Sequence, residues 1–112
     1  MQKLLEKLQW DRNFALEQAG GDEELLQELL DIFKYSSKDD FTSIEDGVKN
    51  KDTQVICGAA HSIKGAAASL GMAAVRDIAF AIEKDCRAGS LNTAFEKKEE
   101  LGELLQYTYR FS

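Results

Sequence analysis

The stretch DEELLQELLDIFKYSSKDDFTSIEDGVK, residues 22–49, has the clearest periodic pattern in the chain. One set of mostly apolar residues recurs at steps of three and four, the spacing of an amphipathic helix; it comprises Leu26, Leu30, Phe33, Ser37, Phe41, Ile44 and Val48. Leu25 and Leu29 widen this face, and Asp22 is placed to cap the helix with two glutamates behind it. The pattern predicts one helix of roughly 40 Å.

Similar periodic segments lie on both sides of this helix. The chain has eight glycines and no proline, so glycine marks the helix ends. A short amphipathic start contains Leu4, Leu5 and Leu8. We expect further helices over residues 11–19, about 53–70, about 72–88, and from 91 onward. We expect Asp52 or Thr53 to cap the second of these and Ser90 to cap the last.

The expected core faces complete the pattern. The helix over 72–88 carries Val75, Ile78, Ala79, Ile82 and Cys86 on one side, and the last helix carries Leu91, Phe95, Leu101, Leu105 and Tyr109 or Thr108. Strand-like alternation is absent, so the fold class is all-α. Four amphipathic helices with short connections predict an antiparallel up-down-up-down four-helix bundle, with the short N-terminal helical segment packed across it. The 112 residues suit a single domain over 1–112 and a monomer.

Composition excludes several classes of function. The net charge of −6 argues against nucleic acid as a partner. No apolar run approaches the ~18 residues of a membrane span, and the start of the chain has no secretory pattern. Two cysteines form no disulfide framework, which indicates a reducing, cytoplasmic compartment. One histidine and two cysteines are too few for a metal site such as zinc, which usually takes four ligands.

His61 lies in AAHSIKGAAASLG, residues 59–71, the most informative stretch for function. At about 100° per residue, Ile56, Ile63 and Leu70 fall on the side of the helix opposite His61. Those apolar residues belong in the core. The spacing therefore predicts that the imidazole points into solvent.

The face that carries His61 lacks large side chains. Gly58, Gly65 and Ala68 lie within about 60° of it. Two glycines inside a helix cost about 1 kcal/mol each relative to alanine, so stability does not explain them. We interpret the small residues as space for the surface of another protein. Lys64, one turn after His61, places a cation beside the ring.

An exposed imidazole beside a lysine suits reversible phosphorylation on nitrogen. At neutral pH an exposed histidine is largely the neutral, nucleophilic form. Phosphoryl transfer needs mainly positioning and charge stabilisation, and a neighbouring lysine supplies part of the latter.

The motif resembles that of a known family. HSIKG, residues 61–65, followed by Gly71, looks like the signature of histidine phosphotransfer (HPt) domains of two-component phosphorelays. The stretch ALEQAGGDEELL, residues 15–26, is similar to their usual lead-in to the long helix. The resemblance covers roughly residues 10–110. It implies a signal-transduction module that relays a phosphoryl group between receiver-domain aspartates.

The resemblance also implies roles for individual residues. His61 would be phosphorylated, Lys64 would stabilise the phosphoryl group, Gly65 would keep the ring approachable, and Gly71 would help to end the helix. Receiver domains would be the partners, together with a sensor histidine kinase in some relays. The domain would need no cofactor, because Mg²⁺ and the acidic cluster belong to the receiver. A Gly-rich phosphate loop is absent from the sequence, which agrees with a phosphoryl carrier rather than an enzyme with an ATP site.

A polar stripe is expected on the next helix. Arg76, Phe80, Glu83 and Arg87 are spaced so that they lie beside its buried face rather than on it. In HPt domains a polar residue of the equivalent helix hydrogen-bonds the ring; Glu83 is the candidate here, where glutamine is more typical. Phe80 and Arg87 are candidates for docking. The alternatives are that Phe80 packs against the last helix or the N-terminal segment, and that Glu83 and Arg87 form an exposed pair.

Two other functions remain open on the sequence alone. One is the phospho-accepting N-terminal domain of a chemotaxis-type kinase, whose donor is a kinase catalytic domain. The other is a four-helix adaptor that binds receivers without being phosphorylated. Both share the bundle, and they differ in the donor and in whether phosphohistidine forms.

Overall fold

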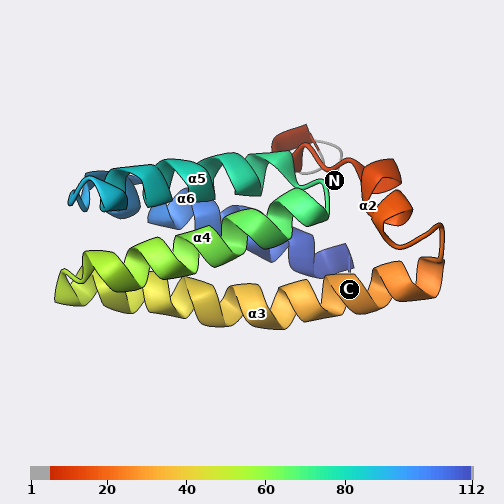
Figure 1. Cartoon of the computed structure of the whole chain (residues 1–112), viewed down its shortest axis with the longest axis horizontal. Coiled ribbons are helices and arrows are strands. Elements are labelled where there is room, and N and C mark those ends of the chain that lie inside the picture. The colour runs from red at the N-terminus through yellow and green to blue at the C-terminus, as the bar shows by residue number, and fades with distance from the viewer. Residues whose placement is uncertain (1–5, 112) are drawn as a thin grey trace.

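A computed structural model of the chain describes residues 6–111, and the regular secondary structure in that range is helical (Figure 1). The elements are α2 (Arg12–Gln18), α3 (Glu23–Asn50), α4 (Thr53–Ser69), α5 (Ala73–Arg87), α6 (Asn92–Thr108) and the 3₁₀ helix η1 (Tyr109–Phe111). From α3 to α6, each helix runs antiparallel to the one before it, and α6 lies alongside α3 (Figure 1). This arrangement confirms the predicted up-down-up-down four-helix bundle.

Aspartate side chains cap the N-termini of α3 and α4. The Asp22 carboxylate accepts the backbone N–H groups of Glu24 and Leu25, at 2.9 and 3.2 Å, where α3 begins. Asp52 accepts the N–H of Val55 at 3.2 Å, where α4 begins. Asp22 therefore caps α3 as predicted, and Asp52 rather than Thr53 caps α4.

The expected cap of α6 is wrong. Leu91 occupies the N-cap position, and Ser90 Oγ accepts the N–H of Asn92 instead. The N–H of Thr93 is accepted at 2.9 Å by Asp85, from the end of α5. Ser90 and a carboxylate on the preceding helix therefore each accept one N–H group of the first turn of α6.

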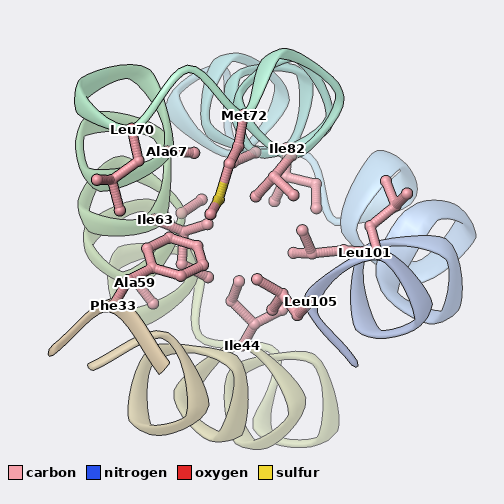
Figure 2. Close-up of a cluster of buried hydrophobic side chains, with 14 of the residues drawn as sticks. Phe33, Ile44, Ala59, Ile63, Ala67, Leu70, Met72, Ile82, Leu101 and Leu105 are labelled. Carbon is pink, nitrogen blue, oxygen red and sulfur yellow. The ribbon is translucent and has the colours of Figure 1, made fainter. Parts of the chain in front are cut away.

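All four bundle helices contribute to one core (Figure 2). The labelled side chains in that view come from α3 (Phe33, Ile44), α4 (Ala59, Ile63, Ala67), the α4–α5 turn (Leu70, Met72), α5 (Ile82) and α6 (Leu101, Leu105). Two expected core positions are exposed instead: Leu25, and Phe95 at 72%. The small Ala94 fills the core at the start of α6, and Phe95 lies about 100° further round the helix.

The N-terminal segment packs on the turn between α4 and α5. Trp10 Nε1 donates to the carbonyl of Leu70 at 2.8 Å, and the Asp11 N–H donates to the carbonyl of Gly71 at 2.9 Å. Gly71 follows α4 with a φ of +70°, and a Cβ there would lie 2.7 Å from the Asp11 carbonyl oxygen. Gly71 is therefore needed both for its backbone conformation and for this close approach. Leu8 is buried as expected; Leu4 and Leu5 lie outside the described residues.

Within residues 6–111, none of the helices has both the length and the apolar composition needed to span a bilayer.

Candidate functional site

His61 stands on the outer face of α4. Its side chain is 60% exposed, whereas Ile56, Ile63 and Ala67 on the opposite face are fully buried. The predicted orientation of the ring is confirmed. It follows from the helical period, because the apolar face can meet the core only if the ring points outward.

The surface around His61 carries only small residues at three positions. A Cβ added at Gly58 or at Gly65 would meet no heavy atom within 4 Å, and Ala68 is exposed. Packing therefore requires glycine at neither position. The open face expected from the sequence is present, and its use for docking remains a prediction.

Glu83 departs from its expected place. Its side chain is only 1% exposed, so it lies in the interface between α5 and α4 rather than beside the buried face. The two helices pack closely along this length, and His61 and Lys64 reach Glu83 from α4. A buried carboxylate is stable only when it is paired, and this one has three partners.

Three side chains contact the Glu83 carboxylate and form a compact network with it. Its Oε2 lies 2.6 Å from His61 Nδ1 and 2.7 Å from Arg87 Nη2, and its Oε1 lies 2.6 Å from Lys64 Nζ. His61 and Lys64 come from α4, whereas Glu83 and Arg87 are one turn apart on α5. The expected contact between Glu83 and the ring is present. The Glu83–Arg87 pair also forms, but on a buried carboxylate.

The network keeps Glu83 ionised. Burial acts to raise its pKa, but the hydrogen bonds from Lys64 and His61, with the charges of Arg87 and Lys64, outweigh burial and hold the pKa below the ordinary 4.5. A carboxylate cannot donate, so the proton between Glu83 and the ring sits on Nδ1. In the neutral ring Nε2 is then the unprotonated, nucleophilic nitrogen.

Phe80 lines a shallow hollow beside this network. Its side chain is 47% exposed, and Lys64 Nζ and Lys84 Nζ lie 5.2 and 5.5 Å from the centre of its ring. The hollow has a volume of about 320 Å³ and is lined by Lys64, Gly65, Ala68, Arg76, Asp77 and Phe80. Phe80 is therefore available at the surface rather than buried against the last helix.

Sequence reasoning missed some contacts of the site. The pairing of Lys64 with Glu83 was not predicted, and the role of Lys64 toward a phosphoryl group stays a prediction. The Cys57 thiol donates to the backbone carbonyl of Glu83 at 3.8 Å. Arg76, grouped with Glu83 in the expected stripe, pairs with its neighbour Asp77. Among the described residues no cluster of three or more His, Cys, Asp or Glu side chains is arranged to hold a metal ion.

Residues 28–108 match the family model of the Hpt domain, which covers most of the chain. The chain belongs to the Hpt domain family. Hpt domains carry out histidine phosphotransfer in two-component phosphorelays, as carriers rather than classical enzymes. They interact there with receiver domains and histidine kinases. The family predicted from the HSIKG motif is thereby confirmed.

Two solved structures resemble this Hpt domain. Histidine-containing phosphotransfer protein B (HptB) from Pseudomonas aeruginosa shares 22% identity over 91% of this chain and 89% of its own, with a TM-score of 0.84. The HPT domain of a sensor hybrid histidine kinase from Shewanella shares 17% identity over 93% of each chain, with a TM-score of 0.74. These likenesses establish the fold. No curated protein sequence matches the chain.

Proposed function

We propose that this Hpt domain accepts a phosphoryl group on Nε2 of His61 from one receiver domain and passes it to the aspartate of another. The observation that carries the proposal is the 2.6 Å contact between His61 Nδ1 and Glu83 Oε2. It places the ring proton on the inner nitrogen and leaves the outer one free to attack phosphorus. Gly58, Gly65 and Ala68 leave room for the receiver around that nitrogen.

Lys64 is the residue that we assign to the phosphoryl group. It lies one turn after His61 on the same face of α4, and its amine is already held within the site by Glu83 Oε1. A lysine ammonium is a compact charge on a flexible stem, which suits a group that must follow a transferring phosphoryl. Gly65 keeps the His61 ring accessible to the receiver, and Gly71 helps to end α4.

Basic side chains gather around Phe80 and Glu83 in a chain whose net charge is −6. They are Lys64, Arg76, Lys84 and Arg87. A receiver presents acidic side chains at its phosphorylation site, so the two surfaces are complementary in charge. We assign the catalytic Mg²⁺ and the acidic cluster to the receiver and no ATP site to this domain. The hollow at Phe80 would take an apolar side chain of the receiver.

We also infer a monomer in a reducing, cytoplasmic compartment. Cys57 and Cys86 are free thiols, which supports a reducing environment. The helices bury their apolar faces against one another, so the core needs no second chain.

The test is to incubate the domain with a phosphorylated receiver and Mg²⁺ and to follow labelled phosphate. We expect a label that acid removes and alkali spares, as for phosphorus on nitrogen. His61→Gln should keep its helical circular dichroism spectrum and take up no label. Equal labelling of His61→Gln would contradict the assignment.

Two further outcomes separate the alternative functions. Labelling by an ATP-charged kinase and not by a phosphorylated receiver would indicate a chemotaxis-type kinase domain. Receiver binding without any phosphohistidine on the wild-type protein would indicate an adaptor.

A further inference from the structure

Two cationic side chains pair with the single carboxylate of Glu83. With a neutral ring, the network contains one negative charge on Glu83 and one positive charge each on Lys64 and Arg87. The site therefore has a surplus of one positive charge around a side chain that is almost fully buried. The Arg87 side chain is 65% exposed, so the surplus lies at the surface of the site, where it attracts a further negative charge.

Phosphorylation of His61 removes this surplus. When Nε2 attacks the phosphorus of an aspartyl phosphate, the N–P bond forms, the P–O bond to the aspartate breaks, and that carboxylate leaves with the electron pair. The ring keeps its Nδ1 proton and becomes a cation, while the phosphoryl oxygens carry two negative charges. The site gains one negative charge in total, so the phosphorylated network is neutral.

The two cations hold Glu83 in different ways. Lys64 contacts Oε1, lies on the same helix as His61 and is partly exposed on its flexible stem. Arg87 contacts Oε2, the oxygen that the ring also uses, and is one turn from Glu83 on α5. Exposure does not separate the two, because the Arg87 side chain is 65% exposed and that of Lys64 26%. Their helices do: Lys64 can reach a phosphoryl group on His61 from the same face of α4, whereas Arg87 is kept beside the carboxylate by its place one turn from Glu83 on α5.

We propose that Arg87 is a positioning residue for phosphorylation of His61: it holds Glu83 through Oε2 while Lys64 moves from Oε1 to the phosphoryl group. This inference rests on the proposed function of His61. Without Arg87, Lys64 would be the only cation on a buried carboxylate. Its departure would then leave Glu83 paired with the ring alone, which disfavours the move.

The test uses potassium phosphoramidate as the phosphoryl donor, because a small donor needs no docking surface. The P–N bond of phosphoramidate breaks, ammonia leaves with the electron pair, and the N–P bond forms at Nε2. The rate of labelling is measured by intact mass for the wild type, Lys64→Ala, Arg87→Ala and the double variant. Lys97→Ala is the control, since it removes one cation from an exposed pair on α6. Thermal melts check that each variant is folded at the assay temperature. Arg87→Met replaces Arg87→Ala if the alanine variant is not folded there.

We expect each single variant to be labelled about 10-fold more slowly, and the double variant to be no more than about 20-fold slower, because the two residues act in one step. Arg87→Lys should recover to within about 3-fold of the wild-type rate, since lysine also pairs with a glutamate one turn earlier. Lys97→Ala should match the wild type. A merely structural role for Arg87 would produce neither the coupling to Lys64 nor the rescue by lysine.

Other results would overturn the inference. A double variant about 100-fold slower would mean that the two cations act independently. A wild-type rate for Arg87→Ala, or no rescue by Arg87→Lys, would also contradict it while leaving the proposed function intact. An unlabelled wild type, or labelling of His61→Gln at the wild-type rate, would overturn the proposed function together with the inference.

Discussion

His61 Nδ1 and Glu83 Oε2 lie 2.6 Å apart, although the histidine is exposed on the surface of α4 and the glutamate is buried beneath it on α5. This contact ties the orientation of a surface ring to the packing of two helices. A mobile surface histidine would exchange its proton between both nitrogens. Here the buried carboxylate favours the tautomer protonated on Nδ1, which leaves Nε2 of the neutral ring unprotonated.

Replacing Glu83 with glutamine should release this selection. A glutamine amide can donate or accept, so the ring should populate both neutral tautomers, whereas the wild type should be almost wholly protonated on Nδ1. The single histidine makes the ¹⁵N spectrum of the imidazole easy to assign. The free energy of unfolding should fall by about 1–3 kcal/mol, because Lys64 and Arg87 lose their carboxylate. Glu100→Gln, at an exposed pair with Lys97, is the control. Identical ring spectra for the wild type and Glu83→Gln would contradict the role of Glu83.

The contribution of Glu83 to stability should depend on pH. Its pKa is below 4.5 in the folded protein and close to 4.5 in the unfolded chain, so the folded protein binds fewer protons in acid. The contribution is therefore complete above about pH 5.5 and decreases as the pH falls through the folded pKa. Urea unfolding at several pH values measures it as the difference between the wild type and Glu83→Gln. A difference that grows on acidification would show that the pKa is raised instead.

Substitutions of Gly65 should change the rate of phosphoryl transfer without destabilising the fold. Gly65→Ala should stabilise the fold by about 0.5–1 kcal/mol, because the new methyl group meets no atom within 4 Å and alanine favours the helix. Gly65→Leu should fold equally well but accept phosphate from a receiver at least about 10-fold more slowly, since the side chain occupies the docking face. Gln106→Leu, a bulky substitution at an exposed position of α6, should transfer normally. Normal transfer by Gly65→Leu would show that the open face is not used.

The matched control for stability is Gly47→Ala, in α3. A Cβ there would lie 2.5 Å from Ile56 Cγ1, so alanine should cost about 1–3 kcal/mol through overpacking. In urea unfolding we expect Gly65→Ala to raise the free energy of unfolding and Gly47→Ala to lower it. Equal signs would mean that helix propensity outweighs packing at Gly47.

Phe80 should matter for the partner more than for the fold. Because the ring is about half exposed, Phe80→Ala should cost no more than about 1 kcal/mol, whereas Ile63→Ala in the core should cost about 2–5 kcal/mol. If the hollow takes a receiver side chain, Phe80→Ala should weaken receiver binding about 10-fold by calorimetry. The phosphoramidate rate should stay unchanged, since no docking is involved. Unaltered receiver affinity would exclude Phe80 from the interface.

A second polar contact, remote from the site in sequence, should affect stability alone. Ser37 Oγ and Tyr109 Oη lie 2.9 Å apart, between α3 and η1. Tyr109→Phe should lower the free energy of unfolding by about 1–2 kcal/mol, because the buried Ser37 loses that partner. Ser37→Ala should cost less in the Tyr109→Phe background than in the wild-type background. In the wild-type background this substitution leaves the Tyr109 hydroxyl without its Ser37 partner, whereas phenylalanine has no hydroxyl to satisfy. Transfer rates should be unaffected; a slower Tyr109→Phe would tie this contact to the site.

Much of the fold was predictable because its causes are local. The caps at Asp22 and Asp52 and the recurring apolar residues each act within a turn or two of the helix, so they can be recognised without knowing the neighbours. The exposure of His61 follows from the same periodicity. The HSIKG motif then gave the family.

The remaining features depend on how the helices lie against one another. The helical period placed Glu83 beside the core, but the close packing of α4 on α5 brings it under His61, where it gathers Lys64 and Arg87. The capping of Thr93 by Asp85 and the exposure of Phe95 likewise reflect the fit of α6 against α5. Rotations and separations between helices are set by side chains from distant parts of the chain, and residue spacing within one helix carries no information about them.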